Sequence, residues 1–250
     1  MNRDDLVTWL DDTLESRGVQ DYCPNGLQVE GTAEVKHVVC GVTACLELIE
    51  AAADRGADAL LVHHGIIWGK MGPITRSFRR RVKALLDNDI NLLGYHLPLD
   101  AHMEVGNGAM VAARLGLQSV QPFGLHRGMT VGVRGELAVP LSIDALSERV
   151  ATSLDTTPLV FGHGPAEIRT VGVVTGAADK DFPQALAAGL DCYITGEASE
   201  FVMHFAREEG IHFIGAGHHA TERWGVQALA ARMGDELGVT WEFVDVPNPV

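Results

Sequence analysis

The sequence predicts an α/β protein of two lobes with mainly parallel sheets. Short apolar segments alternate with segments of helical periodicity, which is typical of parallel strands that helices cover on both faces. The chain has 250 residues, enough for one large α/β domain or two smaller ones. An internal repeat favours two smaller domains.

The first helix is predicted from an apolar stripe and a stop signal. Leu6, Leu10 and Leu14 recur at helical spacing, and Gly18 ends the segment. A loop follows, in which Pro-Asn-Gly at 24–26 is strongly turn-forming. We therefore expect a helix and then a loop before the first buried strand.

A strand-helix-strand unit comes next. HVVCGV (37–42) has the apolar run of a buried strand, 45–55 has the pattern of a helix ended by Gly56, and ADALLVHHG (57–65) is a second buried strand. A further helix and the strand-like INLLGYH (90–96) extend the alternation. This order predicts a sheet with parallel neighbours.

Residues 170–198 align with residues 37–65 without a gap. VVCGVTA falls on VGVVTGA, and each helix ends in Gly-x-Asp before the next strand. Any two strand-helix-strand units share some likeness, but the common Gly-x-Asp favours a pseudo-duplication. It predicts a first lobe of 1–125 and a second of 126–250, with the boundary where glycine and proline interrupt the pattern near 123–127.

The second lobe is expected to begin with the strand-like MTVGVRGEL (129–137) and a helix from Ser142. It ends in a long helix over about 220–237 and a strand, VTWEFVDV (239–246). We expect this C-terminal segment to pack back on the first lobe.

Charge and hydropathy exclude several classes of protein. The formal net charge is −14, the isoelectric point is near 5.1 and the mean hydropathy is +0.09. An acidic chain lacks the basic footprint of a nucleic-acid-binding protein. The basic cluster at 76–83 is better explained as a solvated helix face than as a phosphate-binding patch. No apolar run is long enough for a membrane helix.

The four cysteines form no CxxC pair and no disulfide framework. Cys40 and Cys192 lie in strand-like runs, where cysteine behaves as a small hydrophobic residue. This usage predicts a reducing, cytoplasmic compartment.

Histidines gather after three predicted strands. His63 and His64 end one, His96 ends another, and His218 and His219 open the long helix after a third. In open α/β sheets, ligands bind beyond the carboxyl ends of strands. A lone His-His pair is best explained by one buried and one exposed histidine, but two such pairs after apolar strands favour metal binding.

Two carboxylates accompany the histidines. Asp100 follows His96, and Glu222 lies four residues after His218 and three after His219. Because adjacent helical side chains point about 100° apart, only one of these two histidines should join Glu222. Imidazole and carboxylate without thiolate suit a catalytic site for zinc, manganese, iron or a similar ion. Five ligands fit two ions about 3.5–4 Å apart better than one.

Other catalytic classes fit poorly. The sequence has no GxSxG elbow, no Walker motif and no GxGxxG. Glu197 and Glu200 have two explanations, as site acids or as acids favoured at a helix N-terminus, and we prefer the second. Glu197 aligns with His64 in the repeat.

Several motifs resemble the NIF-three-like proteins, the type-2 homologues of GTP cyclohydrolase I, and the resemblance covers essentially the whole chain. These motifs are DYCPNGLQVEG, ADALLVHHG, NLLGYHLPLDAH, ITGEASE and GHHATER. The resemblance implies two α/β lobes with a dinuclear metal site between them, and a toroidal homohexamer. It favours His218 over His219 as a ligand. The ligands of two divalent ions per subunit would be His63, His64, Asp100, His218 and Glu222.

The resemblance also implies an activity, the hydrolytic opening of the purine ring of GTP. His96 or His219 is our hypothesis for the residue that moves protons, since both adjoin the implied ligands. One alternative is a metal-dependent hydrolase of another nucleotide or a phosphate ester. Another is a non-catalytic metal-binding ring with a scaffold role or a role in stress or DNA-damage responses. We expect no membrane partner, and the acidic composition argues against nucleic acid.

Overall fold

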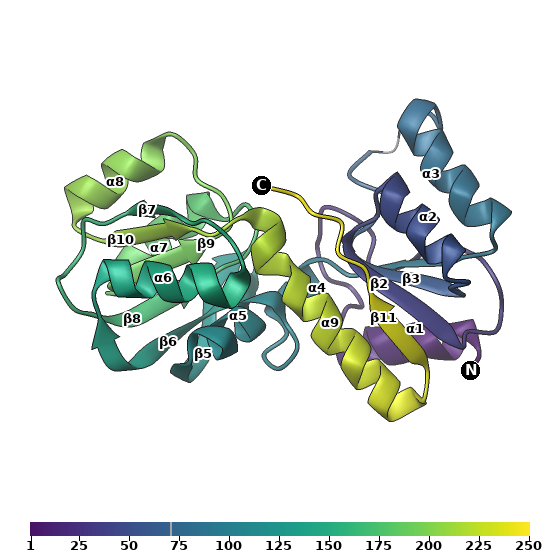
Figure 1. Cartoon of the computed structure of the whole chain (residues 1–250), viewed down its shortest axis with the longest axis horizontal. Coiled ribbons are helices and arrows are strands. Elements are labelled where there is room, and N and C mark those ends of the chain that lie inside the picture. Colours follow the sequence, from purple (N-terminus) through teal and green to yellow (C-terminus); the bar gives the residue numbers. More distant parts are fainter. Residues whose placement is uncertain (71) are drawn as a thin grey trace. The chain divides into compact units, whose positions relative to one another are not determined.

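The computed structural model describes residues 1–70 and 72–250 (Figure 1). The chain forms two compact units. The first comprises Met1–Leu99 and Val226–Val246, and the second comprises Asp100–Gly225 and Pro247–Val250. Within the described part of the chain, none of the helices has both the length and the apolar character needed to cross a membrane.

The first unit contains a five-stranded sheet in the order β1-β4-β3-β2-β11. The four strands β4, β3, β2 and β11 run parallel to their neighbours, and β1 is antiparallel at the edge. The predicted parallel sheet is therefore confirmed here. The strands are β1 (Gly26–Val29), β2 (His37–Thr43), β3 (Ala59–His64), β4 (Asn91–Gly94) and β11 (Thr240–Phe243).

Helices cover the first sheet. Figure 1 shows α2 and α3 together on one face, where their apolar residues join a core with β2, β3 and β4. The predicted first helix is α1, which Asn2 caps by accepting a hydrogen bond from the backbone nitrogen of Asp4. The helices are α1 (Arg3–Thr13), α2 (Leu46–Asp54), α3 (Arg76–Asp87) and the part of α9 (His218–Leu237) from Val226 onward.

The second unit contains a six-stranded sheet in the order β5-β6-β8-β9-β10-β7. Only the pairs β8–β9 and β9–β10 are parallel, so this sheet is mixed rather than mainly parallel as predicted. The reason is a tight turn at Arg127 and Gly128, both with positive φ, which makes β5 and β6 a hairpin and leaves no crossover helix. The strands are β5 (Leu117–His126), β6 (Met129–Leu141), β7 (Leu159–Phe161), β8 (Ile168–Val173), β9 (Cys192–Thr195) and β10 (His212–Gly215).

The boundaries of the units differ from the predicted lobes. The expected division between 125 and 126 falls within β5 of the second unit, because the glycines near it serve a hairpin and not a linker. The first of the two segments that form the first unit instead ends at Leu99, within the short helix α4 (Leu97–Ala101). The C-terminal segment lies in the first unit as far as Val246, where β11 pairs with β2.

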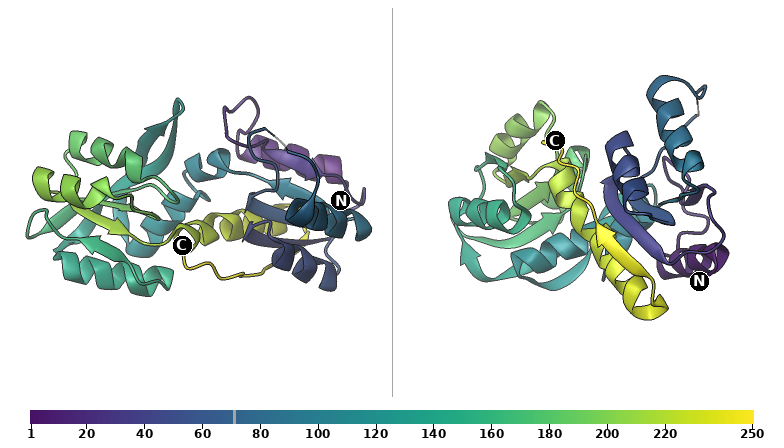
Figure 2. Two further views of the ribbon diagram at one scale, coloured as in Figure 1. Left: turned by 90° about the horizontal axis from the view of Figure 1, so that it is seen from above. Right: turned by 45° about the vertical axis from the view of Figure 1, so that its right-hand side comes forward.

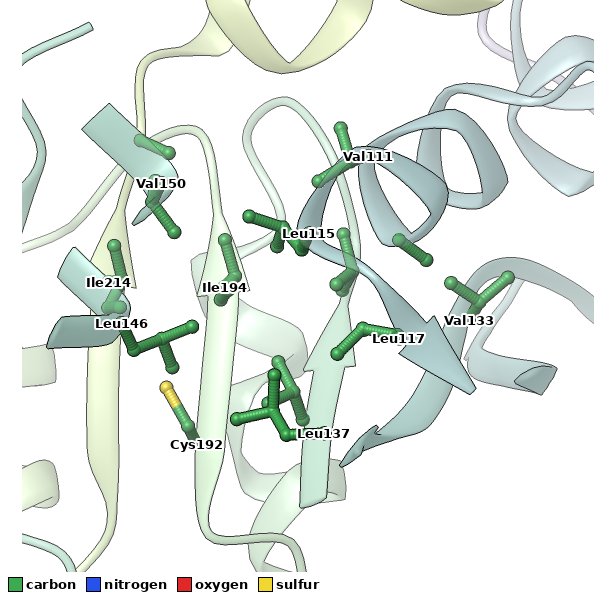
Figure 3. Close-up of a cluster of buried hydrophobic side chains, with 14 of the residues drawn as sticks. Val111, Leu115, Leu117, Val133, Leu137, Leu146, Val150, Cys192, Ile194 and Ile214 are labelled. Atoms are coloured by element: carbon green, nitrogen blue, oxygen red, sulfur yellow. The ribbon is translucent and has the colours of Figure 1, made fainter. Parts of the chain in front are cut away.

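Helices also cover both faces of the second sheet. Figure 2 shows α6 and α8 on opposite faces. On one face, α5 and α6 pack against the strands in a buried cluster that includes Val111, Leu146, Val150 and Ile194 (Figure 3). The helices are α5 (Asn107–Leu115), α6 (Ile143–Leu154), α7 (Phe182–Ala187), α8 (Phe201–Glu209) and the 3-10 helix η1 (Asp179–Asp181).

The predicted pseudo-duplication is visible in the pairing register. Val38 of β2 pairs with Ala59 of β3, and at the same separation along the chain Val171 of β8 pairs with Cys192 of β9. In each unit the next parallel strand, β4 or β10, carries an antiparallel edge strand, β1 or β7. The two units therefore share a four-stranded core, to which the second adds the β5–β6 hairpin.

Candidate metal centre

Three histidines of the first unit lie together at the carboxyl ends of β3 and β4. His63 is fully buried and His64 is half-buried at the end of β3, and His96 follows β4 by two residues. One ring nitrogen from each lies within 4.8 Å of those of the other two. The ring centroids are 4.6 Å apart for His63 and His64, 5.0 Å for His63 and His96, and 5.6 Å for His64 and His96.

The turn after β3 lets adjacent histidines share one site, although alternate side chains of a strand point to opposite faces. Gly65 makes this turn beside Gln28, whose amide oxygen accepts hydrogen bonds from the backbone nitrogens of Ile66 and Ile67. A methyl group on Gly65 would overlap the Gln28 amide. Gly65 thus keeps the chain in place just beyond the two histidines.

Each of these three imidazoles has its Nδ1 atom against an oxygen. Nδ1 of His63 lies 3.0 Å from the carbonyl oxygen of Tyr95, Nδ1 of His64 lies 3.2 Å from Oγ1 of Thr43, and Nδ1 of His96 lies 2.7 Å from a carboxylate oxygen of Asp21. A carbonyl and a carboxylate only accept, so His63 and His96 carry hydrogen on Nδ1, which leaves Nε2 of each ring as the nitrogen that can bind a metal ion.

Asp21 is a site residue that the sequence analysis missed. Its side chain is 1% exposed, and its second oxygen accepts from the backbone nitrogen of Leu97 and the side chain of Asn25. The Asn25 side chain in turn accepts from the backbone nitrogen of His96. Burial alone would raise the pKa of Asp21, but the hydrogen bond and positive charge of His96 outweigh it and lower that pKa to about 2. Asp21 therefore stays ionised.

Cys23 lies in the same loop, and Asp21, Cys23 and His96 together could in principle hold an ion. Burial, reinforced by the charge of Asp21, raises the pKa of the Cys23 thiol to about 12. Thiolate is the form that binds metals, so this cysteine is a poor ligand at neutral pH. The donors that suit a divalent ion here are the three imidazoles.

In the second unit, α9 begins with His218 and places it one turn before Glu222. Nε2 of His218 lies 3.0 Å from Oε2 of Glu222, and Glu222 is only 3% exposed. Nδ1 of His218 lies 2.5 Å from Oε1 of Glu197, in the loop after β9. Burial by itself would lower the pKa of His218, but the two carboxylates outweigh it and raise that pKa to about 9.

The two explanations for Glu197 and Glu200 separate in the structure. Glu200 immediately precedes α8, as expected for an acid at a helix start. Glu197 instead contacts His218, so for this residue the preferred helix-start explanation was wrong. Its alignment with His64 in the repeat was the signal that could have identified it, since His64 ends β3 and Glu197 lies just beyond the equivalent strand β9.

Asp100 is held in the second unit by buried polar side chains. Its Oδ1 accepts from Nδ2 of Asn107 at 2.8 Å and from the hydroxyl of Thr175 at 3.3 Å. The next residue, Gly176, has a φ of +67° and leaves no room for a methyl group, because Oε1 of Glu222 occupies that space. The loop after β8 therefore approaches both Asp100 and Glu222.

His219 is buried next to His218, and its backbone nitrogen donates to the carbonyl oxygen of Val250. The structure places Nε2 of His218 against the carboxylate of Glu222. Of the two histidines nominated for proton movement, His96 belongs to the cluster of the first unit and His219 to α9 of the second.

The donor sets of both units fit divalent metal ions. The first offers imidazole nitrogens, and the second offers an imidazole and two buried carboxylates. Such nitrogen and oxygen donors suit zinc, manganese, iron and similar ions. In both units the donors are backed by hydrogen-bonding groups, as is usual for metal ligands.

These features define a class of protein, the two-unit α/β protein with histidine and carboxylate clusters at the ends of its parallel strands. The model of the Duf34/NIF3 (NGG1p interacting factor 3) family matches residues 1–249, and the chain belongs to this family. The resemblance noted in the sequence is thereby confirmed.

Curated relatives match over the full chain. A protein of Pasteurella multocida named GTP cyclohydrolase 1 type 2 homolog is 46% identical over 252 residues, covering 100% of both chains. A Pseudomonas aeruginosa protein of the same name is 46% identical over 245 residues, covering 98% of this chain and 97% of its own.

Solved structures agree with these matches. The structure of the protein ybgI, described as of unknown function, has a TM-score of 0.95 and 42% identity over 100% of both chains. That of TTHA1606 from Thermus thermophilus has a TM-score of 0.92 and 37% identity, again over 100% of both chains. The curated relatives and the solved structures therefore support the same family and the same fold.

Proposed function

We propose that this chain is a divalent-metal-dependent hydrolase of the cyclohydrolase type. The observation that carries the proposal is the buried Glu222 carboxylate against Nε2 of His218, in a chain that also sets three imidazoles at the ends of β3 and β4. A carboxylate and imidazoles in such surroundings are the ligands of hydrolytic metal centres. The name of the relatives, GTP cyclohydrolase 1 type 2 homolog, supports a nucleotide substrate.

The proposed ligands are His63 and His64 from the first unit with Asp100, His218 and Glu222 from the second. Five ligand side chains suit two ions better than one, because a single catalytic zinc usually has three protein ligands. When bound, the ions would supply Lewis acidity and a water that ionises near neutral pH.

The chain's own residues would hold these donors in place. Asn107 and Thr175 orient the carboxylate of Asp100, and Glu197 fixes the ring of His218 by accepting from Nδ1. Protons would be moved by His96 or His219, the two histidines beside the proposed ligands.

A second candidate function is a non-catalytic metal-binding protein. It is favoured by the word homolog in the relatives' name and by the unknown function of ybgI. The homohexamer that the family resemblance implies would suit either function, and light scattering of the full chain measures it directly.

The discriminating experiment measures turnover and metal content together. Protein stripped with a chelator and reloaded with Zn²⁺, Mn²⁺ or Fe²⁺ is incubated with a nucleotide panel that includes GTP, and products are identified by mass. We expect a metal-dependent hydrolysis product that Glu222→Gln abolishes. His204→Gln, at an exposed histidine of α8, serves as the control. Metal binding without any product would reject the enzyme and leave the metal-binding protein.

A further inference from the structure

Two exposed aromatic side chains lie beside His96 in the first unit. Trp68 is 41% exposed and Tyr22 is 42% exposed, and with Phe201 of α8 they are the most exposed aromatic side chains in the described part of the chain. The Trp68 ring lies 5.2 Å from that of His96 and 5.6 Å from that of His64, centroid to centroid. The Tyr22 ring lies 6.2 Å from that of His96. Single exposed apolar residues are ordinary, but these two gather at one histidine cluster.

Backbone hydrogen bonds hold this aromatic pair, Tyr22 and Trp68, in place. Nε1 of Trp68 donates to the carbonyl oxygen of Gly65 at 2.9 Å, and the backbone nitrogen of Gly69 donates to the carbonyl oxygen of Tyr22, also at 2.9 Å. The turn after β3 is thereby tied to the loop that carries Tyr22. Because the indole N–H is the only polar group of the Trp68 side chain and already has its acceptor, this side chain exposes ring surface.

Ring surface of this kind suits flat aromatic ligands. The imidazoles do not stack on the pair, since the Trp68 ring is inclined at 78° to His96 and 59° to His64, and the Tyr22 ring is inclined at 63° to His96. Stacking of a nucleobase on an aromatic side chain strengthens binding by about 5–100-fold per base, and any base can stack because each has a π face. Tryptophan and tyrosine also lose little conformational entropy on binding, because each has only two side-chain torsions.

A phosphate group matches this surface less well. The aromatic pair offers no positive charge, and the residue that precedes Tyr22 is the buried, ionised Asp21. A phosphate placed here would lie against ring surface and near a carboxylate, whereas a neutral heterocycle would meet no repulsion.

We propose that Trp68 and Tyr22 bind the heterocyclic base of a nucleotide, so that the base and not the phosphates lies beside the histidines of β3 and β4. The inference rests on the proposed function and narrows it. The part of a nucleotide that lies at the metal ligands is the part that reacts, so a base in this position favours opening of the heterocycle over hydrolysis of a phosphate ester.

The test compares ligands with and without a base on the full-length chelated protein, in which metal-dependent turnover cannot occur. Dissociation constants of guanosine 5′-phosphate and ribose 5-phosphate are measured by ligand-detected NMR titration, which reaches millimolar values. We expect guanosine 5′-phosphate to bind at least about fivefold more tightly. Saturation of the protein's aromatic protons should transfer to the proton on C8 of the base.

Replacing Trp68 separates stacking from a structural role. Leucine removes the ring and the indole donor, whereas phenylalanine removes the donor and keeps a ring. We expect Trp68→Leu to weaken binding of guanosine 5′-phosphate about 5–100-fold and Trp68→Phe to weaken it less than about fivefold, with ribose 5-phosphate unaffected by either. Tyr22→Leu and Tyr22→Phe form a second pair of the same design. Phe201→Leu, at the exposed aromatic residue of α8, should leave both affinities unchanged.

Three results would overturn the proposal. One is absent or equal binding of the two ligands, and another is the parent's affinity in both Trp68→Leu and Tyr22→Leu. The third is an equal loss in Trp68→Leu and Trp68→Phe, which would assign the effect to the hydrogen bond with Gly65. Should Trp68→Leu fail to fold, as judged by thermal unfolding, the two Tyr22 variants decide. Turnover of GTP without preference for the base counts against this inference alone, and base binding without turnover counts against the hydrolase alone.

Discussion

Asn107 donates a hydrogen bond of 2.8 Å to the carboxylate of Asp100, and both residues are buried in the second unit. The oxygen of the same amide accepts from the backbone nitrogen of Gly225 in α9, at 2.9 Å. One side chain therefore links a proposed ligand of α4 to the helix that carries His218 and Glu222, and it depends on an amide having both a donor and an acceptor.

Replacing Asn107 with alanine should damage both stability and metal binding. The change leaves the Gly225 nitrogen without its acceptor and Asp100 without a donor, which costs about 1–3 kcal/mol of unfolding free energy. Loss of support for a ligand should weaken metal binding about 10–100-fold. Denaturant unfolding and metal titration measure the two effects. Asn88→Ala, at an exposed helix end, is the control, and equal behaviour of the two variants would contradict the prediction.

Gly176→Ala should displace Glu222. The new methyl group would occupy the space of Oε1 of Glu222, in addition to being strained at a φ of +67°. We expect a loss of about 3 kcal/mol or more in stability, together with a loss of metal affinity. Gly189 has the same φ and nothing within 4 Å of the added methyl group. Gly189→Ala should therefore cost only about 1–2 kcal/mol and leave metal binding intact. Similar metal affinities in the two variants would refute this account of Glu222.

Replacing Asp58 or Asp191 with alanine should lower the unfolding free energy by similar amounts. Asp58 accepts from the backbone nitrogens of Lys36 and His37, and Asp191 accepts from those of Arg169 and Thr170. Alanine at either position leaves two backbone donors without their acceptor, a cost of about 1–3 kcal/mol.

Thermal and denaturant unfolding measure these losses. The control is Asp12→Ala, which removes an exposed ion pair with Arg17 and should cost less than about 1 kcal/mol. A large effect at one of the two repeat positions and none at the other would argue against equivalent roles.

The stability of the metal-free protein should fall between about pH 6.5 and pH 9 because of His218. Its pKa is raised to about 9 in the folded chain, against 6.5 as the ordinary value. A raised pKa means that the stabilisation is complete below the unfolded value and is lost as the pH rises through the folded one. Unfolding midpoints of chelated protein across this range provide the measurement.

Glu197→Gln removes one of the two carboxylates at His218 and should make that pH dependence shallower. With Zn²⁺ added, stability should rise rather than fall with pH, since the ion binds only the deprotonated imidazole. If the chelated parent and the Glu197→Gln variant lose stability with the same slope, Glu197 does not contribute to the raised pKa of His218.

Much of the fold could be predicted from the sequence because its signals are local. Apolar runs and their glycine stops place β2, α2 and β3 to within a few residues, whereas α1 ends at Thr13, before the expected stop at Gly18. The Gly-x-Asp repeat identified the pseudo-duplication, and its aspartates accept equivalent backbone hydrogen bonds in the two units. The histidine pairs were recognisable because one ends the buried strand β3 and the other opens the helix that follows β10.

Tertiary structure decided what depends on partners distant in sequence. The mixed second sheet follows from the β5–β6 hairpin, whose glycines resemble those of a linker until the pairing is known. Asp21 lies 75 residues before His96, and nothing in its own loop indicates that its carboxylate will accept from that ring. Residue types and spacing determine which side chains can bind a metal, but the orientation of an imidazole is set by the oxygen against its other nitrogen. That oxygen comes from whichever segment the fold places there.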